Sequence, residues 1–317
     1  MARIFVTRSL PGRALERLAD AHETEVWPDR LPPPRPALEE RARSAEGLLS
    51  LLTDPIDAEL IAACQELRAI SNYAVGVDNV DLAAATARGI PVGNTPGVLT
   101  DSTADLALAL MLGIARRIVE GDEFVQAGEW VTWEPGLLLG HDLHGATVGI
   151  IGFGRIGQAV ARRLDGFGCE ILHTSRSGGV ELGELLERSD FVTLHCPLTA
   201  ETRGLIGAQA LRRMKPSAYL VNTARGPIVD SEALRGALEQ GEIAGAALDV
   251  TEPEPLPADH PLLGAPNLVV IPHLGSATHA TRERMADMAV DNLLAGLAGE
   301  RMPYCANPQV YGEAARA

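Results

Sequence analysis

The chain has 317 residues, of which 46% are hydrophobic and 22% charged, and its formal net charge is −15 at pH 7. The length predicts two domains, and the composition is typical of a globular protein. The acidic charge would repel phosphates, which argues against a nucleic-acid partner. No secretory signal or membrane-spanning stretch stands out, and the four scattered cysteines predict buried free thiols, no metal site and a cytoplasmic protein.

The first third of the chain alternates short apolar runs with helical patterns, which predicts a small α/β domain with a parallel sheet. The expected strands are 3–7, 47–52, 67–73 and 90–93, and the expected helices are 12–21, 57–64 and 81–88. Pro32–Pro36 is interpreted as a rigid surface loop. A single longer helix is predicted over roughly residues 103–126.

The second half repeats the strand–helix pattern. A strand near 147–151 is followed by a helix over 158–164, and further strands are expected at 191–194, 219–222, 245–248 and 268–271. A final helix over 281–297 is expected to return to the first domain. Repeated βα units predict a doubly wound sheet whose ligand lies at the carboxyl ends of the strands.

The most informative motif follows the apolar run 147–151 and has glycines at Gly152, Gly154 and Gly157. In a dinucleotide-binding turn, the first glycine makes the tight turn and the second lets a pyrophosphate approach the backbone. The third lets helix and strand pack closely, and the helix N-terminus supplies N–H groups to the phosphates. The strand before this turn and the helix after it favour a dinucleotide site over a purely structural turn.

Three polar residues follow predicted strands of the second half, namely Arg225, Glu254 and His273. An arginine fork holds a carboxylate and polarises a carbonyl, a histidine delivers a proton near neutral pH, and a carboxylate orients that histidine. Each residue alone is more typical of a surface charge, a loop or a strand cap. Their joint placement at strand ends favours a catalytic set.

Further motifs occupy residues 46–54, 72–81, 195–199, 222–226, 249–255 and 272–278. Together with the glycine turn, they resemble the D-isomer-specific 2-hydroxyacid dehydrogenases, and within them the glyoxylate/hydroxypyruvate reductase branch, over nearly the whole chain. The expected fold is α/β, with a doubly wound Rossmann cofactor domain (99–286) and a smaller flavodoxin-like α/β substrate domain (1–98 and 287–317).

The resemblance implies that Arg225, Glu254 and His273 are catalytic. It also implies that Leu52 and the backbone N–H groups of Val75 and Gly76 bind the substrate, whose carboxylate the two N–H groups would hold. Family members are usually homodimers that pack through the cofactor domain and the long helix. Trp133 then either reaches the neighbouring subunit's site or is an interface aromatic without a substrate role.

Cofactor preference depends on the end of the second Rossmann strand, where an NAD enzyme usually has Asp or Glu. Here Ser175 takes that place and Arg176 follows, which favours NADPH, with NADH as the alternative. The segment 177–189 looks shorter than in the family, which implies a more open adenosine pocket. The expected cofactor-binding residues are Thr103, Gly152, Phe153, Gly154, Arg155, Ile156, Gly157, Ser175, Arg176, Cys196, Pro197, Thr202, Thr223, Ala224, Asp249 and Gly275.

The sequence thus predicts an NADPH-preferring reductase that converts small 2-keto acids, glyoxylate or hydroxypyruvate, to D-2-hydroxy acids with a histidine as proton donor. One alternative is an NAD-dependent D-2-hydroxyacid dehydrogenase of another substrate, and another is a non-enzymatic dinucleotide-sensing corepressor. Formate dehydrogenases of the family carry Gln where Glu254 lies, and phosphite dehydrogenases carry Lys where Val75 lies. Neither substitution is present.

Overall fold

The computed structural model describes residues 1–312 and divides into two compact units. Unit 1 comprises Met1–Leu99 and the residues from Thr278 onward, and unit 2 comprises Thr100–Ala277. Residues 313–317, which the sequence assigned to the substrate domain, lie outside the described part. The expected boundary between 286 and 287 falls inside helix α11 (His279–Leu297), whose apolar side packs into the core of unit 1. The observed boundary therefore precedes this helix, because a helix buries its apolar side against one core.

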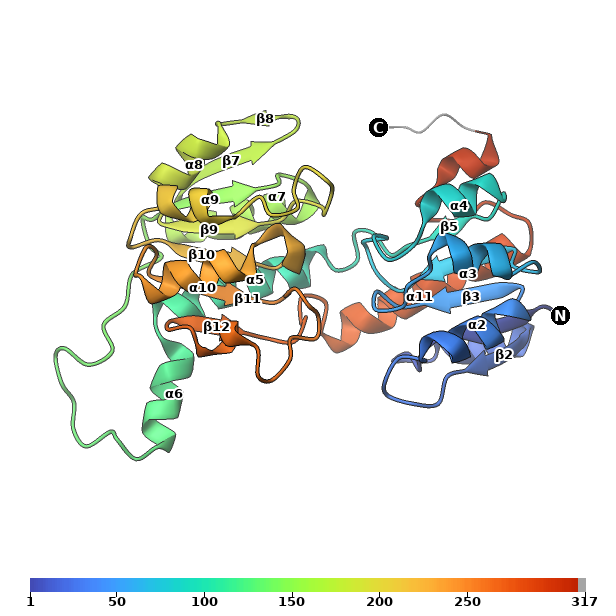
Figure 1. The fold of residues 1–317 in the computed structure, drawn as a ribbon, viewed down its shortest axis with the longest axis horizontal. Coiled ribbons are helices and arrows are strands. Elements are labelled where there is room, and N and C mark those ends of the chain that lie inside the picture. The colour runs from blue at the N-terminus through green and yellow to red at the C-terminus, as the bar shows by residue number, and fades with distance from the viewer. Residues whose placement is uncertain (313–317) are drawn as a thin grey trace. The chain divides into compact units, whose positions relative to one another are not determined.

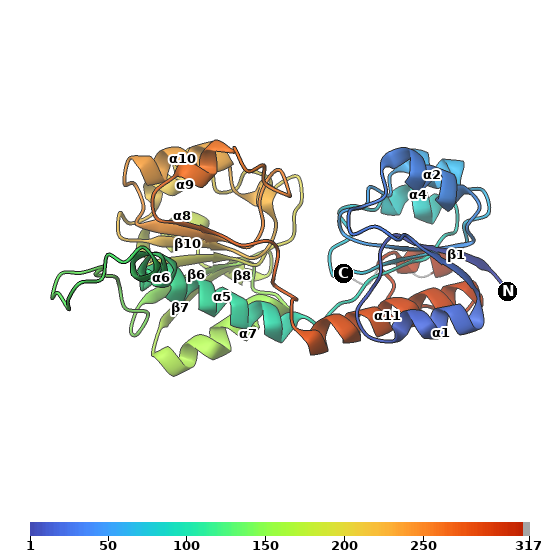
Figure 2. The same cartoon turned by 90° about the horizontal axis from the view of Figure 1, so that it is seen from below.

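Unit 1 contains a sheet of five parallel strands in the order β2-β1-β3-β4-β5, the flavodoxin-like order. Helices α1 and α11 cover one face of this sheet, and α2 and α4 cover the other (Figure 2). Asp57 and Asp81 cap α3 and α4 by accepting backbone N–H bonds. The elements are β1 (Arg3–Val6), α1 (Ala14–Ala21), β2 (Glu23–Val26), α2 (Arg35–Arg43), β3 (Gly47–Ser50), α3 (Ala58–Ala63), β4 (Ala69–Asn72), α4 (Leu82–Ala87) and β5 (Val92–Gly93).

Two elements of unit 1 were not predicted from the sequence. β2 is an edge strand whose sequence, ETEV, is mostly polar, so it lacks the apolar pattern of the inner strands. The interpretation of Pro32–Pro36 as a loop was wrong at its end, because α2 begins at Arg35 and contains Pro36 in its first turn. Proline is accepted there because the first-turn N–H has no intrahelical partner and its φ is already helical.

Unit 2 contains a seven-stranded sheet in the order β12-β11-β10-β9-β6-β7-β8. All its pairings are parallel except the two-residue strand β8, which forms an antiparallel hairpin with β7. Apolar clusters cover both faces, with α8, α9 and α10 on one and α5 and α7 on the other (Figure 2). The two sheets confirm the predicted fold class. The elements are α5 (Thr100–Ala115), α6 (Ile118–Gln126), β6 (Thr147–Ile151), α7 (Arg155–Leu164), β7 (Glu170–Ser175), β8 (Gly178–Gly179), α8 (Leu182–Arg188), β9 (Phe191–Leu194), α9 (Ala208–Arg213), β10 (Tyr219–Asn222), α10 (Ser231–Glu239), β11 (Gly245–Leu248) and β12 (Leu268–Val270).

The predicted long helix over 103–126 is instead two helices, α5 and α6. Arg117 lies between them with a left-handed φ of 53°, which ends the first helix. The chain that returns after α6 satisfies the last carbonyl of α5, because the His141 N–H donates to Ala115 O at 2.9 Å. A Cβ on Gly140 would lie 2.1 Å from the same oxygen, so only glycine allows this approach. α6 and the chain after it extend from the rest of unit 2 (Figure 1).

Candidate active site

The glycine turn between β6 and α7 uses its three glycines in three different ways. Gly152 has a φ of 93°, and a Cβ there would lie 2.4 Å from Cys196 N. A Cβ on Gly157 would lie 2.3 Å from Gly152 O, whereas a Cβ on Gly154 would meet nothing within 4 Å. The first and third glycines are therefore required by the fold, and the second leaves the backbone open to a ligand.

The start of α7 is suited to an anion. Its N-cap is Gly154, which offers no side chain to the first-turn N–H groups, and Arg155 and Ile156 follow as the first helical residues. Exposed first-turn N–H groups bind phosphate well. Phe153 is stacked on His173 of β7, with ring centroids 4.0 Å apart. This turn fits the pyrophosphate of a dinucleotide.

The loop after β9 borders the glycine turn. The backbone of Cys196 sets the limit on Gly152, and burial raises the pKa of the Cys196 thiol. The Thr202 hydroxyl donates to Pro197 O at 2.7 Å and accepts from the Thr199 N–H at 2.8 Å, which fixes the shape of this loop. One loop next to Gly152 therefore contains three residues that were predicted to contact the cofactor, namely Cys196, Pro197 and Thr202.

His195 lies at the same edge and was not predicted as a site residue. Its Nε2 is 2.9 Å from the Thr193 hydroxyl, and its Nδ1 is 3.5 Å from the hydroxyl of Thr223, a predicted cofactor residue. Burial lowers the pKa of His195 to about 3, so the imidazole is neutral at physiological pH. The sequence signals were its position directly after the strand 191–194 and its place at the start of the motif 195–199.

Ser175 and Arg176 lie at the end of β7, and no carboxylate stands in the Ser175 position. The Ser175 hydroxyl is 3.0 Å from the hydroxyl of Ser177 and donates to Gly178 O at 3.0 Å. Arg176 is exposed in the turn that leads into β8. The Thr199 hydroxyl and, to a lesser extent, the charge of Arg176 lower the pKa of Glu201. Arg176 thus places a positive charge near this strand end. The segment 177–189 contains β8 and α8.

Arg225 lies in the loop after β10, and the buried Asn222 fixes its backbone. Asn222 accepts from the Ala224 N–H at 3.0 Å and donates to Arg225 O at 2.9 Å. The guanidinium Nη1 of Arg225 donates to Ala224 O at 2.8 Å. A Cβ on Gly226 would lie 1.9 Å from Thr251 O, so the loop packs closely against the chain after β11. The same amide thus holds Ala224, predicted to bind the cofactor, and Arg225, predicted to be catalytic.

His273 and Glu254 are brought together as the sequence predicted. Nδ1 of His273 lies 2.6 Å from Oε1 of Glu254, and their side chains are 26% and 30% exposed. His273 has a left-handed φ of 52°, which costs free energy in a residue other than glycine. Since this conformation persists, neighbouring contacts must hold it.

Asp249 provides those contacts. Its backbone O accepts from the His273 N–H at 2.8 Å, and its carboxylate accepts from the N–H groups of Leu274 and Gly275. The Thr103 hydroxyl donates to Gly275 O at 3.1 Å. The Asp249 side chain is buried, and this burial raises its pKa despite the N–H bonds that lower it. Three predicted cofactor residues, Thr103, Asp249 and Gly275, therefore support the loop that carries His273.

The predicted substrate residues are divided between the units. Leu52, 38% exposed, follows β3 of unit 1, and Val75 and Gly76 follow β4. The backbone N–H groups of Val75 and Gly76 have no acceptor among residues 1–312. Trp133 belongs to unit 2, in the irregular chain after α6, and is 77% exposed.

Two kinds of feature are missing from residues 1–312. No group of three or more His, Cys, Asp or Glu side chains has an arrangement that could hold a metal ion. No helix in this part of the chain has the length and apolar character needed to cross a membrane. Of the four free cysteines, Cys64 is buried and the other three are partly exposed, so the prediction that all four are buried was wrong.

Comparison with known proteins decides the family. The family model for the NAD-binding domain of D-isomer specific 2-hydroxyacid dehydrogenases matches residues 108–275. A relative from Korarchaeum cryptofilum named glyoxylate reductase is 51% identical, over 97% of this chain and 96% of its own length. This chain belongs to the D-isomer-specific 2-hydroxyacid dehydrogenase family. It is therefore an NAD(P)-dependent oxidoreductase.

Solved structures agree with this assignment. A crystal structure of a protein from Thermus thermophilus is 50% identical with a TM-score of 0.91, over 96% of this chain and 99% of that one. An NADPH-dependent glyoxylate/hydroxypyruvate reductase from Sinorhizobium meliloti, solved with NADP and malonate, is 35% identical with a TM-score of 0.84, over 100% of this chain and 99% of that one.

Proposed function

We propose that this chain reduces glyoxylate and hydroxypyruvate to the corresponding D-2-hydroxy acids, with NADPH preferred over NADH. The observation that carries the proposal is the His273–Glu254 contact of 2.6 Å on the unit that also holds the glycine turn. The identity of about half over nearly the full length of a glyoxylate reductase supports the substrate.

His273 is the proton donor in this proposal. Its Nδ1 faces Glu254, and we assign Nε2 as the nitrogen that protonates the keto oxygen of the substrate. The Glu254 carboxylate orients the ring and stabilises the imidazolium form. Asp249 keeps the peptide of His273 in its left-handed conformation, which makes Asp249 a positioning residue.

Arg225 of unit 2 and three residues of unit 1 are each assigned to the substrate. The planar guanidinium of Arg225 can contact the carboxylate and the keto oxygen together, and the Asn222 amide fixes the peptide from which it extends. In unit 1, the proposal assigns the backbone N–H groups of Val75 and Gly76 to the substrate carboxylate and Leu52 to the rest of the substrate. Trp133 either contributes to the site of a second copy or only packs between copies.

The nicotinamide dinucleotide, when bound, supplies the hydride for the keto carbon. The glycine turn and the N-terminus of α7 hold the pyrophosphate, and Arg176 pairs with the 2′-phosphate that distinguishes NADPH. Ser175 places no negative charge against that phosphate. The remaining predicted cofactor residues are assigned to the rest of the dinucleotide.

The proposal includes a homodimer and a cytoplasmic location. α6 has no buried residue, and large apolar side chains of α6 and the following chain are exposed, which favours a partner surface of the same kind. The exposed side chains are Ile118, Val119, Val125, Trp130, Val131, Trp133 and Leu139. The free thiols are consistent with a reducing compartment.

Steady-state kinetics with glyoxylate and hydroxypyruvate, each with NADPH and NADH, test the proposal. We expect turnover of both keto acids and a higher kcat/KM with NADPH. His273→Asn should lower kcat by about 10²- to 10⁴-fold, because a general acid typically contributes that factor. NADPH binding without any turnover would instead support the dinucleotide-sensing alternative.

A further inference from the structure

The strand order of unit 1 reverses between β1 and β3, so this sheet has its own crevice at the carboxyl ends of the strands. Two loops begin at this edge. Residues 51–54 follow β3 and carry Leu52, and residues 73–79 follow β4 and carry Val75 and Gly76. These are the loops to which the proposed function assigns the substrate, and the inference below rests on that function.

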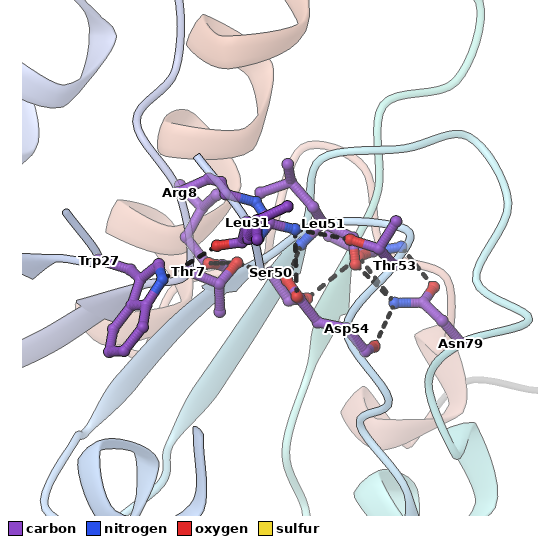
Figure 3. Close-up of polar contacts among 11 residues, drawn as sticks. Thr7, Arg8, Trp27, Leu31, Ser50, Leu51, Thr53, Asp54 and Asn79 are labelled. Carbon is purple, nitrogen blue, oxygen red and sulfur yellow. Dashed lines mark hydrogen bonds and ion pairs between the residues drawn. The ribbon is translucent and has the colours of Figure 1, made fainter. Parts of the chain in front are cut away.

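The side chain of Asn79 ties the first loop to the second. Its amide Nδ2 donates to Leu51 O and to Asp54 O, both at 2.9 Å, and so spans the peptide units on either side of Leu52 (Figure 3). Both acceptors are carbonyl oxygens, so they need a donor group, which in asparagine is the NH₂ end of the amide. No isosteric carboxylate or apolar residue can replace this contact.

Asn72, at the end of β4, connects Asn79 to the second loop. Its Nδ2 donates to Asn79 Oδ1 at 2.9 Å and to Gly76 O at 3.0 Å. Its Oδ1 accepts from the Ser50 hydroxyl at 3.0 Å. Asn72 is fully buried, and all these contacts lie within unit 1. The two asparagines therefore form one hydrogen-bonded pair that contacts both loops.

Three successive carbonyls of the second loop are tied back into unit 1. Ala74 O accepts from the Thr95 N–H and Val75 O from Asn94 Nδ2, both at 2.8 Å, while Gly76 O accepts from Asn72. In a trans peptide, C=O and N–H point in opposite directions. The N–H groups of Val75, Gly76 and Val77 therefore point away from these three anchors, and successive N–H groups of this kind bind anions.

The first loop is held at a second point. The buried carboxylate of Asp54 accepts from the Thr7 hydroxyl and from the Leu51 N–H (Figure 3). Leu51 is thus bonded through its N–H to Asp54 and through its carbonyl to Asn79. The side chain of Leu52 remains exposed between these bonds.

We propose that Asn72 and Asn79 are positioning residues that set the affinity for the 2-keto acid. They act through the backbone, because Asn72 orients the peptides that bind the carboxylate and Asn79 keeps Leu52 in place relative to them. Removing either amide frees one loop without changing a residue that touches the substrate.

The test replaces each asparagine by leucine, which is similar in size and adds no charge that would itself repel a carboxylate. We expect Asn72→Leu and Asn79→Leu to raise KM for glyoxylate by about 10-fold or more, because each loses at least three buried or partly buried hydrogen bonds. kcat should stay within about threefold and the Kd of NADPH should not change, since the dinucleotide residues belong to unit 2.

Ser71→Ala is the matched control. Ser71 precedes Asn72 on β4 and is equally buried, but it donates to Ala289 O of α11 at 2.7 Å and contacts neither loop. Its loss should lower stability without raising KM. An equal rise of KM in the control, or an unchanged KM in both leucine variants, would overturn the inference. If a leucine variant does not fold, Asn79→Ser, which keeps one donor, should show a smaller rise of KM.

Hydrogen exchange separates this inference from the proposed function. In wild type and Ser71→Ala, the hydrogen-bonded amides of Leu51, Asp54 and Thr95, which lie in or donate to the two loops, should exchange slowly, and in the leucine variants about 10-fold faster or more. This measurement needs no substrate. A wild type that does not reduce glyoxylate would contradict the proposed function alone, whereas unchanged exchange in the leucine variants would contradict the role of the asparagines.

Discussion

The two sheets of this protein have similar topology, but the loops at their crevices are built from different kinds of residue. Each is a largely parallel sheet with one reversal of strand order, between β6 and β9 in unit 2 and between β1 and β3 in unit 1. At the unit 2 crevice, glycines remove side chains so that backbone N–H groups stay open. At the unit 1 crevice, two side-chain amides and a buried carboxylate are bonded to the loops and hold them in place.

The difference follows from what each edge has to hold. A pyrophosphate is large and is best met by a bare helix N-terminus, which α7 provides and which needs no side chain. The loops of unit 1 have no helix directly behind their N–H groups, so their direction depends on bonds to the opposite carbonyls. The same sheet topology therefore supports two kinds of site. In one, glycines leave backbone N–H groups uncovered, and in the other, side-chain hydrogen bonds orient the backbone N–H groups.

The largest expected effect is at Gly152. A methyl group there would meet the Cys196 backbone at 2.4 Å in a residue with positive φ, so Gly152→Ala should destabilise unit 2 by about 2–6 kcal/mol. Gly154→Ala, whose Cβ meets nothing, should leave stability nearly unchanged and weaken NADPH binding. Urea unfolding and NADPH titration of both variants measure this. Equal stability losses would show that the two glycines do not have separate functions.

The stability of unit 1 should depend on the buried charge of Asp54. Asp54→Asn removes the charge that accepts from Thr7 and Leu51 and that lies 3.6 Å from Arg8, so we expect a loss of about 2–3 kcal/mol. The fluorescence of Trp27 during urea unfolding, in a chain with Trp130 and Trp133 replaced by Phe, reports on unit 1. NADPH affinity should stay unchanged, and a fall in that affinity would contradict the separation of the two crevices.

Acid should affect unit 2 through His195. Its pKa is about 3 in the folded protein against about 6.5 when unfolded, so the unfolded chain binds the extra proton between these values. The contribution of His195 to the free energy of unfolding is therefore fully present above about pH 6.5. It is lost as the pH drops toward 3, by at most about 1.4 kcal/mol per pH unit. Urea unfolding between about pH 5 and 7.5 should show a shallower pH dependence in His195→Asn. The same slope in both proteins would argue against a buried neutral imidazole.

The smallest expected effect is on cofactor selectivity. Arg176→Ala should lower kcat/KM for NADPH by about 10-fold and leave NADH nearly unchanged, because a charge-assisted contact at an exposed residue has the lower end of its usual strength. Arg188→Ala is the control, since Arg188 is also an exposed cation of unit 2 but pairs with Glu170 and Glu184. A wild type that uses NADH as well as NADPH would make the assignment of Arg176 wrong.

Much of unit 2 could be predicted because its signals are local. The strands 191–194, 219–222 and 245–248 are short, mainly apolar runs, and the structure has them at those residues. The glycine turn is recognisable because the backbone conformation at Gly152 excludes other residues. The contact of His273 with Glu254 was predicted from their positions after two strands of one sheet.

Signals that depend on distant residues were missed. The helix break at Arg117 is fixed by the return of Gly140 and His141 to the end of α5, which the apolar spacing over 103–126 does not contain. β2 is a strand because β1 pairs with it, although its own sequence is polar. His195 looked like one member of a motif until its ring was placed between Thr193 and Thr223.

The sequence by itself was enough to predict the family and the α/β fold class, both of which are confirmed, and to propose the residues that carry the chemistry, since each depends on periodicity or on a motif of a few residues. Only the tertiary structure decided that α11 belongs wholly to unit 1, that Asp249 supports the loop of His273, and that Asn72 and Asn79 join two loops. The physical reason is that a buried amide or carboxylate has no sequence signature of its role. Its function is defined by the carbonyls and N–H groups that folding brings within about 3 Å of it.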